Sequence, residues 1–214
     1  MIIFKSINKL NKKVNFKANV GFVPTMGALH KGHISLINES KKRCKKTLVS
    51  IFINPSQFNK LSDLKNYPKK LVKDIKILRS LKIDYLLLPR TSEIYKKRKY
   101  RQLKINKKDK IMCALYRPGH FEGVLAVINQ YLISIKVNHI FLGEKDYQQF
   151  FLIKNFVKKK FKIKVHKCKT VRDKSKIALS SRNYLLTKKS LLKSSIISKI
   201  LLNFNRKLKR NFLI

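Results

Sequence analysis

The chain alternates short apolar runs with stretches of helical periodicity, and this alternation limits the possible folds more than any other feature. After most of the apolar runs, apolar residues recur three or four positions apart. Strands that alternate with helices form a parallel sheet covered on both faces. We therefore expect an α/β, Rossmann-like fold with a parallel sheet and helices on both faces. The predicted strands are 20–24, 47–55, 84–89, 138–143 and the start of 163–171, and the predicted helices are 34–43, 69–81, 123–135 and 147–161.

One ten-residue turn, PTMGALHKGH (24–33), leaves the first predicted strand and enters a helix. Ligands of parallel sheets bind beyond the carboxyl ends of the strands. His30 and His33 fall on one side of the first helical turn, and Gly27 and Gly32 let the backbone approach a phosphate. Imidazoles there can donate to phosphate oxygens as charge builds at phosphorus. A metal pair is disfavoured because no carboxylate or cysteine lies nearby; a chance structural pair and a phosphate cradle without chemistry stay open.

Four further turns are polar: SIFINPSQF (50–58), RPGHFEGV (117–124), GEKDYQQ (143–149) and ALSSRN (178–183). In the first, Asn54 and Gln57 suit hydrogen bonds to a small polar substrate, although an Asn-Pro turn alone is the favoured explanation of that segment. The second contains Arg117 and His120, and it fits either an anion contact or the end of a loop.

The last two turns bring cations. Lys145 stands at a strand-to-helix turn, where it can meet phosphate as a point charge. Ser180, Ser181 and Arg182 supply donors for a polyphosphate, and arginine suits a planar multidentate grip; a polar linker explains that hexamer equally well. Four of the five polar segments directly follow predicted strands, so we expect them to share one cleft.

These turns in combination resemble a known superfamily. The chain lacks GxxxxGK[ST] and is not a P-loop protein. The set resembles the HxGH nucleotidyltransferase superfamily. Within it, the segments VPTMGALHKGH, SIFINPSQF, YPKKL, RPGHFEGV, FLGEKDYQQ and ALSSRN are similar to the pantothenate synthetase (pantoate–β-alanine ligase) family, from about Val20 to about Thr187. The resemblance implies an AMP-forming ligase: pantoate and ATP give pantoyl adenylate and pyrophosphate, and β-alanine then displaces AMP to give pantothenate.

The resemblance also implies catalytic and nucleotide-binding residues. His33 would be the proton donor, His30 would assist at the phosphates, and Lys145 and Arg182 would complete the catalytic set. The implied ATP-binding residues are Met26, Gly27, Ala28, Leu29, His30, Lys31, Gly32, His33, Gly143, Glu144, Lys145, Asp146, Val171, Leu179, Ser180, Ser181 and Arg182.

Substrate, metal and subunit contacts follow from the same resemblance. Gln57 and Gln149 would hold pantoate, and Gln57 would also lie near β-alanine. Asp74 matches the position associated with Mg2+, which would act together with ATP. The family forms homodimers through the sheet-bearing domain, so the resemblance implies a homodimer.

The implied organisation is a Rossmann-like nucleotide- and pantoate-binding domain at 1–177. Residues 178–214 would form a linker and a remnant helix of a strongly truncated C-terminal lid domain. From 187 onwards the pattern predicts one amphipathic helix, with Thr187 as its N-cap. Loss of a lid would threaten retention of a reactive adenylate. Ser175 and Lys176 replace the Asp-Gly pair that the family has before ALSSRN, which changes the turn there.

Composition favours a cytoplasmic protein and offers one rival function. The net charge of +42 suggests a nucleic-acid-binding module, but the lysines are spread along the chain without a stripe, so we expect no specific nucleic acid. Three well-separated cysteines indicate neither disulfides nor zinc, as in a reducing cytosol. The start lacks a signal peptide pattern and no apolar run reaches membrane-spanning length, so we expect no membrane partner.

Two alternatives to a competent ligase stay open. One is a degenerate, non-catalytic ATP-binding remnant of the same family, and the other is a different nucleotidyltransferase. The presence of His30, His33, Lys145 and Arg182 disfavours the remnant. The segments around Gln57 and Gln149 favour pantoate over other substrates.

Overall fold

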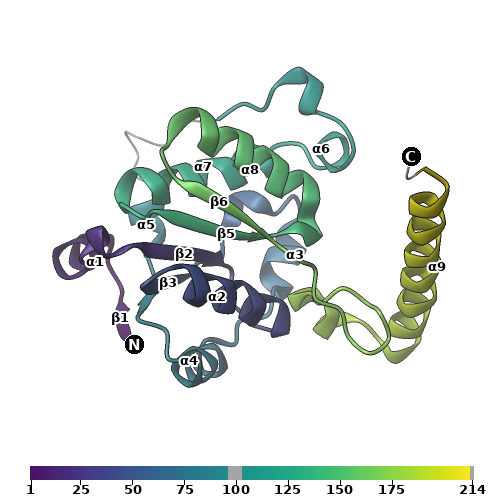
Figure 1. Ribbon diagram of the computed structural model, residues 1–214, viewed down its shortest axis with the longest axis horizontal. Helices are drawn as coiled ribbons and strands as arrows, with labels where there is room; N and C mark the ends of the chain where they lie inside the picture. Colours follow the sequence, from purple (N-terminus) through teal and green to yellow (C-terminus); the bar gives the residue numbers. More distant parts are fainter. Residues whose placement is uncertain (96–102, 213–214) are drawn as a thin grey trace.

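The computed structural model describes residues 1–95 and 103–212, and its centre is a six-stranded sheet in which every pairing is parallel (Figure 1). The strand order is β1-β4-β3-β2-β5-β6. The α/β fold expected from the alternating pattern is therefore confirmed. The strands are β1 (Ile2–Phe4), β2 (Val20–Thr25), β3 (Lys46–Ile51), β4 (Tyr85–Leu87), β5 (His139–Gly143) and β6 (Lys164–Cys168).

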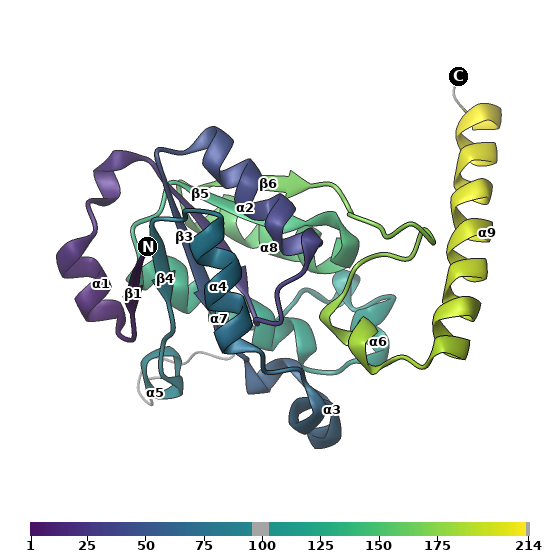
Figure 2. The same cartoon turned by 90° about the horizontal axis from the view of Figure 1, so that it is seen from below.

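Successive side chains of the central strands enter two separate cores, as the pleat of a strand requires. Phe22 and Leu48 pack in one core, and Val23 and Val49 pack in the other. The first core is covered by α1 (Ile7–Lys13), α7 (His120–Ser134) and α8 (Tyr147–Lys160). The second is covered by α2 (Lys31–Arg43) and α4 (Leu71–Ser80), on the opposite face of the sheet (Figures 1 and 2). Each fully buried apolar side chain stabilises the fold by about 1.5–3 kcal/mol, so this two-sided sheet forms a rigid base.

The strand order changes direction beside β2. The chain passes from β2 to β3 on one side, whereas β5 pairs with β2 on the other. The carboxyl ends of β2 and β5 therefore flank a topological switch point, where open α/β sheets bind ligands. Gly21 of β2 allows α2 to pack closely against the sheet, because a Cβ on Gly21 would lie 2.3 Å from Oγ of Ser40 on α2.

The remaining short elements lie along the chain between the strands and the longer helices. They are the helices α3 (Leu61–Asn66), α5 (Thr91–Ile94) and α6 (Cys113–Tyr116), with the 3-10 turns η1 (Phe16–Ala18), η2 (Pro55–Gln57), η3 (Lys107–Asp109), η4 (Glu144–Asp146) and η5 (Ser181–Leu185).

The structure differs from the sequence prediction mainly at element ends. β1 and α1 were not predicted, because a three-residue strand is too short to show an alternating pattern. The turn with the two histidines therefore follows the second strand, not the first. The predicted strand 47–55 ends at Ile51, because Asn54 and Pro55 begin the turn η2. Within the predicted irregular stretch 95–110, residues 96–102 lie outside the described residues.

The last helix, α9 (Lys188–Phe212), stands to one side of the α/β body (Figures 1 and 2). Thr187 caps it as predicted, because its Oγ1 accepts from the Ser190 N–H at 3.1 Å. One tie to the body is the Ser195 hydroxyl, which donates to the Ser175 carbonyl at 2.8 Å. The division into 1–177 and 178–214 stays a prediction. None of the helices among the described residues is long and apolar enough to cross a membrane.

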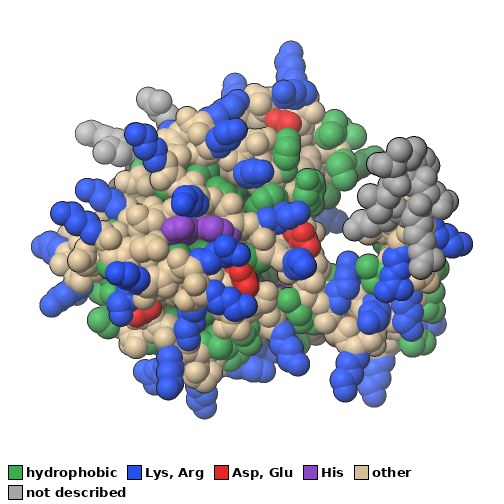
Figure 3. Space-filling model, in the orientation of Figure 1, with side chains coloured by type: hydrophobic (Ala, Val, Ile, Leu, Met, Phe, Trp, Pro, Cys, Tyr) green, Lys and Arg blue, Asp and Glu red, His purple; other side chains and the backbone are tan. Residues whose placement is uncertain are grey.

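Basic side chains are spread over the surface of both parts of the molecule. On the face shown in Figure 3, lysines and arginines stand over the α/β body and around α9, with a few acidic side chains between them. The chain has 52 lysines and arginines against 10 acidic residues, so basic side chains outnumber acidic ones about five to one. The expectation that no specific nucleic acid binds stays a prediction.

Candidate active site

We call the turn after β2 the histidine loop (residues 26–33). Asp74 of α4 holds this loop by accepting hydrogen bonds from its backbone. Asp74 is only 1% exposed, and its two carboxylate oxygens accept from the backbone N–H groups of Ala28 at 2.9 Å and Leu29 at 2.8 Å. Gly27 and Ala28 both adopt positive φ, at 80° and 49°. A buried carboxylate is tolerated only when it is well bonded, so this contact fixes the unusual path of the loop.

His30 and His33 close the start of α2 with their own side chains. His30 Nδ1 accepts from the Gly32 N–H at 3.1 Å, and His33 Nδ1 accepts from the His30 N–H at 3.3 Å. The two ring centroids are 4.1 Å apart. Gly32 is required under this arrangement, because a Cβ there would lie 2.7 Å from the His30 ring. An Nδ1 that accepts must be unprotonated, so each neutral ring carries its proton on Nε2.

Both imidazoles are held in the neutral form. Burial, the neighbouring His30 and the charge of Lys145 lower the pKa of His33 to about 3. Burial and Lys145 also lower the pKa of His30. At neutral pH each ring is therefore uncharged and offers its Nε2–H group as a hydrogen-bond donor. A neutral imidazole can stabilise a phosphate oxygen by hydrogen bonding, and the proton-donor role of His33 stays a prediction.

The turn after β5 brings Lys145 to the same place. Its effect on the pKa of both histidines places the ammonium group near them, across the switch point. Lys145 Nζ lies 3.0 Å from Asp146 Oδ1. Glu144 holds the turn, because its carboxylate accepts from the Thr170 N–H at 3.1 Å and lies 3.4 Å from Lys167 Nζ.

Residues 178–186, which we call the arginine segment, run beside the histidine loop. The buried Ser181 hydroxyl lies 3.1 Å from the Ala28 carbonyl oxygen, to which it donates, and 3.4 Å from that of Gly27. Upstream, the Leu179 N–H donates to the Val171 carbonyl at 3.0 Å, next to an antiparallel bridge between Arg172 and Ala178. The turn that closes this bridge contains Ser175 and Lys176, and Lys176 takes a left-handed φ of 70°. The turn therefore forms without a glycine.

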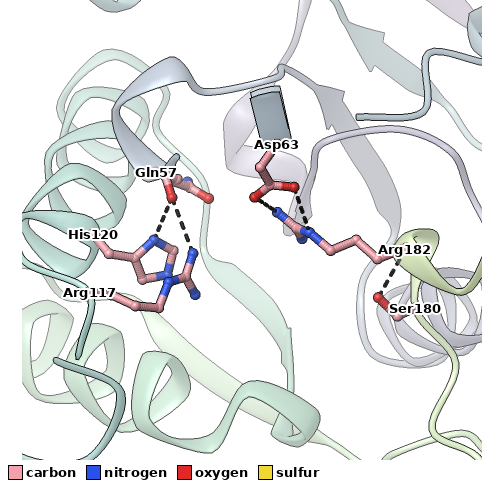
Figure 4. Close-up of polar contacts among 6 residues, drawn as sticks. All are labelled: Gln57, Asp63, Arg117, His120, Ser180 and Arg182. Carbon is pink, nitrogen blue, oxygen red and sulfur yellow. Dashed lines mark hydrogen bonds and ion pairs between the residues drawn. The ribbon is translucent and has the colours of Figure 1, made fainter. Parts of the chain in front are cut away.

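Arg182 makes the main ion pair of the arginine segment. Its Nε and Nη2 donate to the two oxygens of Asp63, on α3, at 3.1 and 2.9 Å (Figure 4). The hydrogen bond from Arg182 lowers the pKa of Asp63, against the opposing effect of partial burial. The Arg182 N–H also donates to Ser180 Oγ at 3.2 Å. Arg182 is thus fixed at both its backbone and its guanidinium group.

Gln57 lies on η2, and its backbone is anchored by two side chains. Its carbonyl oxygen lies 2.7 Å from His120 Nδ1 and accepts from Arg117 Nη2 at 3.3 Å (Figure 4). Asn54 is buried, accepts from the Ser56 N–H at 3.3 Å and donates to the Gly123 carbonyl at 3.2 Å. Asn54 therefore holds the turn, and the Asn-Pro turn interpretation describes this residue better than a substrate contact.

The structure thus brings most of the predicted residues to one edge of the sheet. The histidine loop and the arginine segment touch directly, and Lys145 acts on both histidines. Gln149 lies in the first turn of α8, directly after the Lys145 turn, and is half-buried. Met26 is half-buried and Lys31 is exposed. The roles of these residues stay predictions.

The predicted magnesium ligand has a different task in this geometry. Both Asp74 oxygens already accept hydrogen bonds from backbone N–H groups of the histidine loop, and the side chain is buried. Across the described residues, no group of three or more His, Cys, Asp or Glu side chains is arranged to hold a metal ion. These contacts do not fit direct ligation by Asp74; a magnesium ion bound with ATP would be held mainly by phosphate oxygens and water.

Sequence reasoning missed Asp63 and Tyr67, which both contact the arginine segment. Asp63 pairs with Arg182, and the Tyr67 ring lies 5.3 Å from the Arg182 guanidinium carbon. A signal was present: the chain has only ten acidic residues, so an acid beside a motif is informative. Their pairing with residues about 120 positions away could not be read from spacing.

Comparison with known proteins identifies the family. The model of the Pantoate-beta-alanine ligase family matches residues 2–212. The chain belongs to this family. It is 46% identical over 194 residues to the pantothenate synthetase of Francisella tularensis subsp. novicida (strain U112), covering 87% of this chain and 74% of that protein. It is 46% identical over 189 residues to that of Buchnera aphidicola subsp. Acyrthosiphon pisum (strain 5A), covering 87% and 65% respectively.

Solved structures of the family match the fold described above. The pantoate-beta-alanine ligase of Francisella tularensis, complexed with beta-gamma ATP and beta-alanine, matches with a TM-score of 0.89 and 41% identity, over 94% of this chain and 79% of that chain. The pantothenate synthetase of Thermus thermophilus matches with a TM-score of 0.93 and 30% identity, over 99% and 76%. The family resemblance seen in the motifs is therefore confirmed.

Proposed function

We propose that this chain joins pantoate to β-alanine at the expense of ATP, the activity of the family to which it belongs. A pantoate carboxylate oxygen attacks the α-phosphorus of ATP, and pyrophosphate leaves. The β-alanine amine then attacks the acyl carbon of the adenylate, loses a proton, and AMP leaves with the bonding electrons. The products are pantothenate, AMP and pyrophosphate.

The observation that supports this proposal best is the pair of neutral, Nε2-protonated imidazoles at the switch point. Backbone N–H groups hold Nδ1 of His30 and His33, and Lys145 lies close enough to lower both pKa values. In the proposed site, both Nε2–H groups and the Lys145 ammonium group donate to phosphate oxygens. Such donors act most strongly on the charge that develops in the transition state.

The rest of the nucleotide would lie between the turn after β5 and the arginine segment. Gly143 to Asp146, Val171 and Leu179 to Arg182 would contact it, along with the histidine loop from Met26 to His33. The direct contact between Ser181 and the histidine loop supports a shared site. Mg2+ would enter with ATP, bound to its phosphates.

Gln57 and Gln149 are proposed to hold pantoate, and Gln57 also to lie near β-alanine. Gln57 sits on a turn that Arg117 and His120 fix through its backbone oxygen, which leaves its side-chain amide available as a substrate contact. An attacking carboxylate held in line with the α-phosphorus supplies much of the rate acceleration in such a transfer.

A homodimer through the sheet-bearing domain is part of the proposal. Light scattering at micromolar protein concentration should give twice the mass of the 25.2 kDa chain. A mass of one chain would contradict the dimer without affecting the assigned chemistry.

The test of function follows both products in separate reactions. The protein is incubated with MgATP and pantoate, with and without β-alanine, and pyrophosphate and AMP are measured. We expect pyrophosphate release with pantoate alone, and AMP release in step with it once β-alanine is added. ATP binding without pyrophosphate release would contradict the proposal and identify a non-catalytic remnant. Pyrophosphate release that needs no pantoate would indicate another nucleotidyltransferase.

A further inference from the structure

Asp63 and Arg182 meet through one particular edge of the guanidinium group. Asp63 occupies Nε and Nη2, the side edge of the planar fork. An arginine has five N–H donors, so three remain: one of Nη1 and one of Nη2 on the end edge, and a second of Nη1 on the opposite side. That end edge matches the two oxygens of a phosphate group in the same way that the side edge matches a carboxylate. Both partners can therefore bind Arg182 at once.

Two aromatic rings lie close to the same guanidinium group. The Arg182 Cζ lies 5.6 Å from the centre of the Phe58 ring and 5.3 Å from that of Tyr67, within the range of cation–π contact. Lys70 lies over the Tyr184 ring at 3.9 Å and ties the same two parts of the chain together. The contacts leave the Arg182 side chain 41% exposed, so part of it stays accessible.

The surrounding charge favours an anionic partner on the side edge. Arg117 acts electrostatically on both Arg182 and Asp63, and it also lies beside Gln57. Arg117 and Arg182 carry the same charge and repel each other, and the carboxylate of Asp63 offsets part of that repulsion. Asp63 therefore fixes both the position and the orientation of the Arg182 guanidinium group.

We propose that Asp63 is a positioning residue for the reaction: it holds the side edge of Arg182 so that the end edge meets the phosphates of ATP. This inference rests on the proposed function, which assigns Arg182 to the nucleotide. A long side chain that is fixed before its ligand arrives loses less freedom on binding, so the orientation itself improves affinity.

The experiment is a double-mutant cycle on MgATP affinity, measured by calorimetry without pantoate. Arg182→Gln should weaken MgATP binding by about ten-fold, the effect of losing a charged hydrogen-bond donor. Asp63→Asn, which keeps shape but loses the carboxylate, should weaken it by about three- to ten-fold. In the Arg182→Gln background, Asp63→Asn should change nothing further, because the residue that it positions is gone.

Two controls separate positioning from general effects. Glu39→Gln removes one acidic charge from an exposed ion-pair site on α2 and should leave MgATP affinity unchanged. Asp63→Glu keeps the two oxygens and should recover part of the loss, and thermal unfolding verifies that each variant is folded. In turnover, Asp63→Asn should raise KM for ATP while KM for pantoate stays constant.

Three results would overturn the inference. Unchanged or tighter MgATP binding in Asp63→Asn would mean that Asp63 is idle or competes with phosphate. An equal loss in both backgrounds would mean a structural role independent of Arg182. If Arg182→Gln alone did not change MgATP affinity, the assignment of Arg182 to the nucleotide would be wrong. That result differs from one in which Arg182 matters and Asp63 does not, so the experiment distinguishes failure of the proposed function from failure of this inference.

Discussion

The histidine loop and the arginine segment are neighbours in the site, yet they are held by different means. Backbone N–H groups and one buried carboxylate fix the histidine loop. The arginine segment depends on side chains, chiefly the partly exposed Asp63–Arg182 pair and the Ser181 hydroxyl. Buried backbone hydrogen bonds resist local opening, whereas a partly exposed ion pair adds little to the stability of the fold even where it orients a side chain. We therefore infer that the histidine loop is the rigid half of the site, whereas the arginine segment depends on the Asp63–Arg182 pair for its orientation.

Removal of a donor from the rigid half should have the largest effect on the reaction. His33→Ala deletes one of the two Nε2–H donors that we propose to face the developing charge. Pyrophosphate release with saturating pantoate and ATP should fall by about 10²–10³-fold. His166→Ala, on β6 and stacked on Phe141, is the matched control and should retain most of the rate. Unchanged release in His33→Ala would remove it from the catalytic set.

Asp74→Ala should show how much the rigid half depends on its support. The substitution leaves two buried N–H groups, those of Ala28 and Leu29, without an acceptor. Chemical denaturation should report a loss of about 2–4 kcal/mol in the free energy of unfolding, together with most of the activity. A free energy of unfolding equal to that of the parent protein would show that the loop keeps its conformation without Asp74.

Gln57→Ala should weaken pantoate use without disturbing the loop, because the anchoring bonds go to its backbone oxygen. We expect KM for pantoate to rise by about ten-fold, the effect of one hydrogen bond to a charged group, and MgATP affinity to stay constant. An equal loss for both substrates would contradict the pocket assignment.

The neutral histidines should also give a pH signature. Because the pKa of His33 in the folded protein is lowered to about 3, the unfolded chain binds protons more readily below its ordinary value of 6.5. Stability should therefore be fully present above pH 6.5 and decline as the pH falls toward 3, by at most about 1.4 kcal/mol per pH unit for this residue. Denaturation of the parent and of His33→Gln between pH 7 and pH 4 tests this. Parallel curves would mean that His33 titrates normally in the folded protein.

The smallest effect is expected at the turn before the arginine segment. Lys176 has a φ of 70°, which disfavours any residue with a Cβ. Lys176→Gly should raise the free energy of unfolding by about 0.5–1 kcal/mol, with activity unchanged. A loss of stability would show that the turn depends on the lysine side chain.

The same contrast explains what the sequence could predict. The histidine loop was predictable because its glycines, histidines and flanking strand are local in the chain, and β2 to β6 follow from local apolar patterns. The support of that loop by Asp74, 46 positions from Ala28, has no local signature. The Asp63–Arg182 pair spans 119 positions and is equally invisible to spacing. Asn54 was ambiguous because an amide that caps a turn and one that binds a substrate look alike in sequence.

The central claim is that two neutral imidazoles, each protonated on Nε2, face the phosphates of ATP from one rigid loop. Nitrogen–proton NMR of the histidine rings at pH 7 tests it directly, with His30→Gln and His33→Gln to assign the signals and MgATP as the titrant. We predict unprotonated Nδ1 and protonated Nε2 in both rings, with both Nε2–H signals shifting as MgATP binds. A charged ring, a ring protonated on Nδ1 instead of Nε2, or Nε2–H signals that do not shift at saturating MgATP would contradict this claim.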